Sequence, residues 1–337
     1  MSTKTTKKTS AKKTVKRKYQ PDPNKKPYAE TVAESIIAAL EQGTAPWQKP
    51  WEPGRPGAGL PHNPVSGTTY KGINLLSLIM TPFSDPRWMT YKQATDAGAQ
   101  VRKGSKGTMI QYWSWEKMVN KTDADGKPVL DDKGKPVKQK VRLEKPTPFY
   151  ATVFNAEQID GLEPYKEPEA LEESWQAIER VEKIVENSGA DIRHQEQGRA
   201  YYASAADHIL MPMRHQFPRA DQYYATLLHE LGHWTGHKSR LNRDMSGSFG
   251  SISYAKEELR AEIASMMLGM EMGIGHDPGQ HVAYVESWID VLKNDPLEIF
   301  RAASDAEKIR EYMLGMELSK DYKPKSRHTE AQADPSP

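Results

Sequence analysis

The stretch that decides the fold is LLHELGHWTGH, residues 227–237. It places His229 and His233 four residues apart, with Glu230 directly after the first histidine. On a helix the two histidines project from one face, where both imidazoles can reach one tetrahedral zinc ion. Glu230 can take a proton from a water molecule that zinc acidifies, so it is the candidate general base. The pattern predicts a zinc peptidase site; two surface histidines on an ordinary helix are the alternative.

The residues around this motif favour a buried helix. An apolar back face is formed by Leu227, Leu228 and Leu231. Gly232 costs about 1 kcal/mol inside a helix, so we expect a substrate or a neighbouring strand to approach closely there.

The third metal ligand has three candidates, His237, Glu258 and Glu262. Gly236 stands where metzincin peptidases carry a turning glycine, but Ser239 occupies the position of their third histidine. His237 follows the turn directly. We therefore expect it to cap the helix or to support the site from behind the ligands.

The stretch EELRAE, residues 257–262, favours Glu258. The spacing of Glu258, Ala261 and Glu262 resembles the Glu-x-x-Ala-Asp pattern of gluzincin-like peptidases, where the first acid binds zinc and the last orients a ligand histidine. We predict Glu258 as the ligand and Glu262 as the orienting residue, with the reverse as the alternative, and expect Glu257 to face solvent. Candidates for stabilising an oxyanion, among which the sequence does not choose, are Tyr223, Tyr254, His276, His281 and Tyr284.

Length and composition limit the kind of protein. The 337 residues suffice for two domains, and the absence of cysteine leaves His, Asp and Glu as metal ligands. The sequence holds neither an apolar run of about 20 residues nor an apolar signal segment, so we expect a cytoplasmic protein with no membrane partner. Residues 1–26 hold ten Lys or Arg against one Asp, as in a disordered tail that attracts nucleic acid or merely aids solubility.

The pattern of turns and periodicities predicts an α+β protein. We expect a small β-rich domain over residues 27–162 and a zincin-like α+β domain over 163–317. Two turn signals, DADGKP and DDKGKP, predict an exposed hairpin insertion at 117–142. Residues 318–337 are expected to be disordered.

The N-terminal domain interleaves aromatic and cationic residues. Bases of single-stranded nucleic acid stack on rings while cations follow the phosphates, so this mixture indicates single-stranded DNA binding; a β-rich domain with aromatic core residues is the alternative. VRKGSKGT, residues 101–108, is a basic turn whose amides can approach phosphate. The candidate contacts are Trp47, Trp51, Tyr70, Lys71, Trp88, Tyr91, Lys92, Arg102, Lys103, Lys106, Tyr112 and Trp113.

Several stretches resemble one family. APWQKPW, NPVSGTTYKGINLLSL, WMTYKQATDAGAQVRKGSKGT and VFNAEQIDGL are similar to the N-terminal domain of ArdC-type antirestriction proteins, which also occurs in some plasmid primases. AYYASAADHILMP, YYATLLHELGHWTGHKSRLNR and FGSISYAKEELRAEIAS resemble the zincin-like domain of the same proteins. The resemblance covers about residues 27–316.

The resemblance implies an antirestriction protein of a plasmid or phage that binds single-stranded DNA and protects entering DNA from host restriction. It implies His229, His233 and Glu258 as ligands of Zn2+ or another divalent metal, Glu230 as the catalytic residue, and an unidentified host protein as substrate. A further option is that the protein itself is transferred into a recipient cell together with conjugating DNA. The alternatives are a single-stranded-DNA-dependent protease for DNA–protein crosslinks and a DNA-shielding protein with a structural metal.

Overall fold

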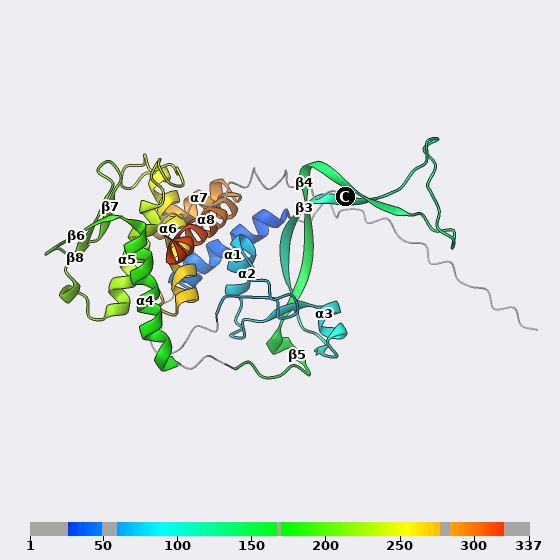
Figure 1. Cartoon of the computed structure of the whole chain (residues 1–337), viewed down its shortest axis with the longest axis horizontal. Coiled ribbons are helices and arrows are strands. Elements are labelled where there is room, and N and C mark those ends of the chain that lie inside the picture. The colour runs from blue at the N-terminus through cyan, green and yellow to red at the C-terminus, as the bar shows by residue number, and fades with distance from the viewer. Residues whose placement is uncertain (1–25, 49–58, 167–169, 277–283, 320–337) are drawn as a thin grey trace, which may run out of the picture.

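The computed structural model describes residues 26–48, 59–166, 170–276 and 284–319 (Figure 1). The predicted disordered tails lie almost wholly outside these residues. The helices are α1 (Tyr28–Glu41), α2 (Gly72–Ile79), α3 (Tyr91–Asp96), α4 (Ala170–Ser188), α5 (Ala220–Trp234), α6 (Ile252–Met272), α7 (Val285–Asn294) and α8 (Glu298–Leu318). The strands are β1 (Trp88–Thr90), β2 (Gln100–Val101), β3 (Thr108–Asn120), β4 (Lys138–Asn155), β5 (Ile159–Asp160), β6 (Asp191–Gln195), β7 (Tyr201–Ala203) and β8 (His208–Pro212). Within the described ranges, helices long and apolar enough to cross a membrane are lacking.

One large apolar core joins most of the helices, with α6 packed between α5 and α8. Helices α1 and α2 belong to this core, although the predicted domain boundary assigns them to the N-terminal domain. The stripe Val32, Ile36 and Leu40 of α1 is buried, and α1 packs against α7 while α2 packs against α8. The boundary at residue 163 stays a prediction, and the two halves share a core across it.

The N-terminal sheet has the strand order β1-β4-β3, all antiparallel. Its small core contains Leu78, Trp88, Ile110 and Val153. The hydroxyl of Thr90 caps α3 by accepting a hydrogen bond from the backbone amide of Gln93. VRKGSKGT, predicted as a basic turn, connects β2 to β3, and β2 pairs with β5 rather than with β3.

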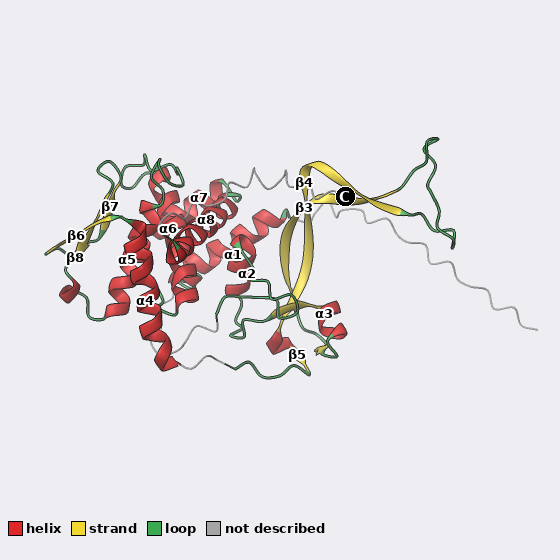
Figure 2. Cartoon of the chain, viewed as in Figure 1, coloured by secondary structure: helices red, strands yellow, loops and turns green. Residues whose placement is uncertain are grey.

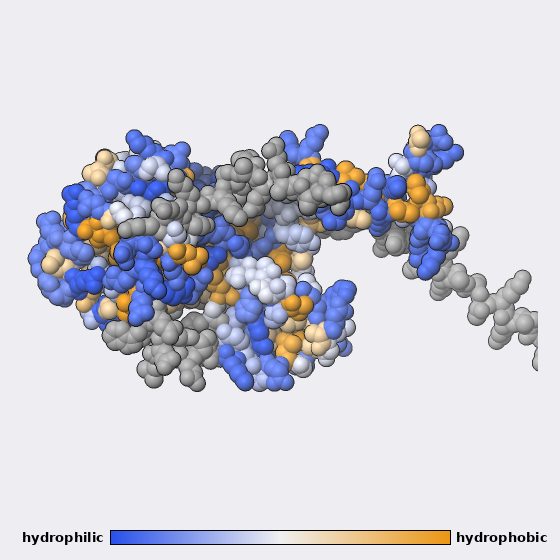
Figure 3. Space-filling model, in the orientation of Figure 1, coloured by the Kyte–Doolittle hydropathy of each residue, from blue (hydrophilic) through white to orange (hydrophobic). Residues whose placement is uncertain are grey.

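Strands β3 and β4 continue beyond this sheet as a long two-stranded ribbon (Figure 2). The register shifts between Ser114 and Glu116, and residues 117–142, predicted as an exposed hairpin, form the outer part of the ribbon. Gly126 and Gly134 adopt positive φ angles at the two predicted turns. The ribbon leaves the helical body of the molecule, and Figure 3 shows apolar side chains gathered on it.

The C-terminal half adds a three-stranded sheet to the helices. β8 lies between β6, which runs parallel to it, and β7, which runs antiparallel. This arrangement leaves β7 at one edge of the sheet, and both β7 and β8 pack against α5. The sheet and α6 therefore flank the helix that carries the histidines.

Candidate metal centre

Two histidines and one glutamate meet where α5 crosses α6. Nε2 of His229 lies 3.1 Å from Nε2 of His233. The Glu258 carboxylate reaches both rings, with Oε2 3.6 Å from His229 Nε2 and Oε1 3.5 Å from His233 Nε2. All three residues are buried, and one candidate ligand atom of each lies within 4.8 Å of the others.

The spacing of these atoms suits one divalent metal ion. A tetrahedral zinc ion with bonds of about 2.0–2.2 Å sets its ligand atoms about 3.3 Å apart. The distances of 3.1, 3.5 and 3.6 Å lie around this value. Two imidazoles and one carboxylate are also a donor set found in catalytic zinc sites, where a fourth position stays open to water or substrate.

Two small residues face each other where α5 and α6 pack, at ordinary van der Waals distance. A Cβ atom built on Gly232 of α5 would lie 3.8 Å from Cβ of Ala261 on α6. Gly232 therefore faces a neighbouring helix, so the expectation of a substrate or a strand at this position was wrong. This packing brings Glu258, one turn before Ala261, up to the histidines.

A carboxylate lies behind each histidine. Oε2 of Glu262 is 3.3 Å from Nδ1 of His229, the arrangement expected for a residue that orients a ligand. Oε1 of Glu257 is 3.2 Å from Nδ1 of His233. Glu257 is only 7% exposed, so the expectation that it faces solvent was wrong: the loop after α5 covers it, and Arg243 of this loop pairs with it.

The charges in this cluster reinforce one another. Burial alone would lower the pKa of His229, but hydrogen bonds with Glu258 and Glu262 raise it well above its ordinary value. Burial would also lower the pKa of His233, but Glu258 and Glu257 raise it to about 9. Burial would raise the pKa of Glu258, but the two histidines hold it well below its usual range. A cation is therefore favoured at this site, whether a proton or a metal ion.

The cluster opens into a cavity of about 630 Å3. Glu230, the predicted base, lines it and is 5% exposed. Tyr254 and Tyr284 line it as well, and the Tyr284 hydroxyl donates to that of Tyr254 at 3.4 Å. Burial, followed by the neighbouring Glu258, raises the pKa of Tyr254, so its hydroxyl keeps its proton and can donate a hydrogen bond.

Two other oxyanion candidates, Tyr223 and His276, lie elsewhere. Tyr223 contacts His194 through its hydroxyl, at 2.9 Å, and His276 contacts the carbonyl oxygen of Trp47, at 3.1 Å. His281 lies outside the described residues. Residues 200–202, including the start of the edge strand β7, form one wall of the cavity.

His237 lies apart from the three candidate ligands. Its Nδ1 is 2.8 Å from the hydroxyl of Ser239 and 3.9 Å from a carboxylate oxygen of Asp207. Its backbone amide donates to the carbonyl of Trp234 at the end of α5. These contacts correspond to the capping alternative rather than to support of the metal ligands.

Two of the tryptophans predicted to bind DNA are core residues. Trp47 and Trp88 are each 1% exposed, Trp47 in the large core and Trp88 in the N-terminal core, so neither ring can stack on a base. Tyr70 is half-buried, and its hydroxyl donates to the carbonyl of Trp88. Lys71 is paired with Glu311 and Glu307, and Trp51 lies outside the described residues.

The remaining candidates are exposed, namely Tyr91, Lys92, Arg102, Lys103, Lys106, Tyr112 and Trp113. Tyr91, Arg102 and Lys103 line a shared cavity of about 700 Å3 with Phe154. Tyr112 and Trp113 lie on the ribbon, where Tyr112 stacks on Phe149 with ring centroids 5.7 Å apart.

Sequence reasoning missed three exposed aromatic residues of the ribbon. Trp115, Phe149 and Tyr150 are 52%, 38% and 48% exposed. The alternation of side chains in the β4 stretch TPFYATVF, residues 147–154, indicates a strand but not which face of it is exposed to solvent. The strand register shows the exposed positions, because Tyr150 lies opposite Gln111 and Phe149 opposite Tyr112 on the exposed ribbon.

The fold and the site define a zincin-like metallopeptidase domain, and residues 179–305 match the family model of that description. Residues 26–154 match the model for the N-terminal domain of anti-restriction factor ArdC. The chain therefore belongs to the ArdC antirestriction family, as the sequence motifs predicted.

Solved structures agree with this membership. The metal-free crystal structure of antirestriction protein ArdC from plasmid R388 is 34% identical, with a TM-score of 0.66 over 86% of this chain and 98% of that one. Its Mn(II)-bound form is 35% identical, with a TM-score of 0.64 over 88% of this chain and all of that one. DNA primase TraC of Escherichia coli is 63% identical over 294 residues, which are 87% of this chain but only 27% of the primase. This chain thus spans about a quarter of that primase.

Proposed function

We propose that this protein protects the DNA of a plasmid or phage from restriction after entry into a new host cell, by binding single-stranded DNA and cleaving a host protein. The observation that carries the proposal is the buried His229, His233 and Glu258 cluster, which lines the same cavity as Glu230. Membership of the ArdC family supplies the antirestriction context. The site of action is the cytoplasm, with transfer of the protein alongside conjugating DNA as an extension of the same role.

We assign the three clustered side chains as ligands of one divalent metal ion. Their donor set and spacing suit Zn2+, and the Mn(II)-bound ArdC relative supports Mn2+ as the alternative. Such an ion would supply Lewis acidity, which polarises a peptide carbonyl and lowers the pKa of a bound water molecule.

The chain's own residues would perform the proton transfers and hold the substrate. Glu230 accepts the proton of the attacking water and passes it to the leaving amine. Tyr254 donates a hydrogen bond to the developing oxyanion, and Tyr284 supports its hydroxyl from behind. The edge strand β7 pairs with an extended peptide, since its residues Tyr201 and Tyr202 line the cavity.

The exposed aromatic and cationic residues of the N-terminal half support the DNA-binding part of the proposal. Tyr91, Arg102 and Lys103 combine one ring with two cations around a single cavity, which suits a stacked base and its phosphate. Tyr112 and Trp113 extend the set of exposed rings onto the ribbon. DNA bound there would bring the peptidase site near proteins that act on the same DNA.

The deciding experiment compares wild type with Glu230→Gln. Both proteins are assayed for bound metal, for single-stranded DNA binding, for protection of incoming plasmid DNA in a restricting host and for proteolysis of host proteins with single-stranded DNA present. We expect Glu230→Gln to keep metal and DNA binding but to lose protection and proteolysis.

Each other outcome has a distinct meaning. Undiminished protection by Glu230→Gln would contradict a proteolytic role and leave a DNA-shielding protein with a structural metal. Cleavage of proteins only when they are crosslinked to DNA would instead identify a repair protease.

A further inference from the structure

The loop after α5 carries a buried arginine that binds the metal-site helix. The side chain of Arg243 is 8% exposed. Its Nη2 donates to the carbonyl oxygen of Gly232 at 2.7 Å, and its Nη1 donates to the hydroxyl of Thr235 at 2.8 Å. Nε and Nη2 also donate to the two carboxylate oxygens of Glu257, at 3.0 and 2.7 Å. The guanidinium therefore joins the C-terminal end of α5 to α6.

Glu257 extends this contact to a candidate ligand. The same Oε1 that accepts from Arg243 lies 3.2 Å from Nδ1 of His233. A carboxylate in this position holds the proton of the neutral imidazole on Nδ1 and leaves Nε2 to face the metal. Arg243 fixes the carboxylate at two points, which a single rotatable donor could not do.

Gly236 provides the space that the arginine occupies. A Cβ atom built there would lie 2.9 Å from Nη2 of Arg243, 2.9 Å from the carbonyl oxygen of His233 and 2.6 Å from the sulfur of Met245. These distances are too short for any side chain without movement of its surroundings. Gly236 stands where metzincin peptidases carry their turning glycine. In this chain the close packing of Arg243 and Met245 is sufficient to explain why a glycine is needed there.

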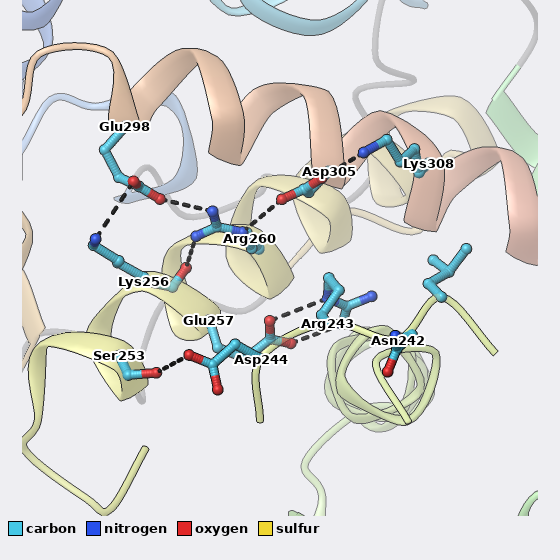
Figure 4. Close-up of a pocket in the computed structure, with 11 residues that line it drawn as sticks. Asn242, Arg243, Asp244, Ser253, Lys256, Glu257, Arg260, Glu298, Asp305 and Lys308 are labelled. Atoms are coloured by element: carbon cyan, nitrogen blue, oxygen red, sulfur yellow. Dashed lines mark hydrogen bonds and ion pairs between the residues drawn. The ribbon is translucent and has the colours of Figure 1, made fainter. Parts of the chain in front are cut away.

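The surrounding charges do not replace this contact. Arg243, Glu257 and their neighbours, among them Arg260, Glu298 and Asp305, line a cavity of about 330 Å3. Figure 4 shows Arg260 pairing with Glu298 and Asp305, whereas Arg243 is directed at Glu257.

We propose that Arg243 is a positioning residue for the metal centre, acting through Glu257 on the orientation and tautomer of His233. The inference rests on the proposed metal site and adds a residue to it. Removing Arg243 leaves the Glu257 carboxylate buried and free to turn, so His233 loses its fixed direction towards the metal.

The test uses the full-length protein with Co2+ as a spectroscopic probe and Zn2+ in competition with a chromophoric chelator. We expect Arg243→Ala and Glu257→Gln each to weaken Zn2+ affinity about 10- to 100-fold and to change the Co2+ absorption spectrum. Arg243→Lys should recover only part of the affinity, because lysine lacks the two-point fork. The Arg243→Ala, Glu257→Gln double variant should be no weaker than the weaker single variant.

Arg240→Ala is the matched control. Arg240 is also buried, pairs with Asp207 and donates to the carbonyl of Trp234 at the same helix end. Its loss should lower thermal stability while leaving Zn2+ affinity and the Co2+ spectrum as in wild type.

Two results would overturn the inference. Wild-type affinity and spectrum in Glu257→Gln, which keeps the shape of the side chain but lacks its charge, would exclude the Glu257 carboxylate as the means of action. Additive losses in the double variant would show that Arg243 acts by another route. If wild type binds no metal and does not differ from His229→Ala, the proposed metal centre itself fails, and the inference with it.

Discussion

Trp88 and Trp113 carry the same side chain on the same sheet, yet their replacement by alanine should have opposite effects. Trp88 is 1% exposed and packs edge-on against Phe83 with ring centroids 5.7 Å apart. Truncating such a buried ring costs about 3–5 kcal/mol of the free energy of unfolding. Trp113 is 59% exposed, so Trp113→Ala should change that free energy by no more than about 0.5 kcal/mol.

For DNA binding, by contrast, we expect the direct loss of a contact in Trp113→Ala and not in Trp88→Ala. Loss of a stacking ring costs about 1–3 kcal/mol, so Trp113→Ala should raise the Kd for an oligothymidylate about 5- to 150-fold. Urea denaturation followed by circular dichroism measures stability, and fluorescence anisotropy of a labelled oligonucleotide at fixed salt measures binding. Leu130→Ala, which removes a 57% exposed apolar side chain from the ribbon tip, is the control for general loss of apolar surface.

Specific results would refute the reasoning. Wild-type DNA affinity in Trp113→Ala would remove the ribbon from the DNA-binding surface. Wild-type stability in Trp88→Ala would contradict the burial of that ring. An equal loss of affinity in Leu130→Ala would mean that apolar contact, and not stacking, explains the effect.

Four further predictions concern the metal site and the basic turn. Glu258→Ala should lose nearly all bound metal by mass spectrometry, whereas Glu262→Ala should retain metal with an affinity about 10- to 100-fold weaker; the opposite order would exchange their roles. Metal binding should release protons and weaken as the pH falls below about 9, since protonated His233 cannot bind metal, and calorimetry in buffers of different ionisation enthalpy measures this release. Affinity for single-stranded DNA should fall steeply with salt, and Lys103→Ala should make this dependence shallower by about one counterion in binding titrations. Gly236→Ala should lower the thermal midpoint, because the added Cβ would lie 2.9 Å from the carbonyl oxygen of His233.

The sequence predicted those elements whose signals are local. The spacing of His229 and His233 favoured a helix, and the turn signals DADGKP and DDKGKP marked the turns where Gly126 and Gly134 adopt positive φ angles. The burial of the acidic residues of α6 was harder to predict. Helical periodicity places Glu257 and Glu258 on different faces of the helix, but it does not reveal what covers each face. A loop of irregular structure covers Glu257, and its path depends on tertiary packing.

Aromatic residues posed the same difficulty in the N-terminal half. A tryptophan favours a core and a stacking surface by the same physical property, a large apolar ring, so composition alone could not separate Trp88 from Trp113. Strand register decides between them, and register depends on pairing with distant residues of β4: Trp88 lies opposite Asn155 and Trp113 opposite Pro148.

The shared core sets a limit on treating the two halves as independent. Ile36 of α1 and Leu75 of α2 are fully buried in the same core as Leu259 of α6 and Ile309 of α8. The peptidase half would expose this apolar surface without the two N-terminal helices. α2 also packs against β3, the strand that carries Trp113, while α8 packs against both α2 and α6. A continuous set of packed elements thus joins the proposed DNA surface to the helix that supplies Glu258, so a force on the ribbon has a physical path to the metal site.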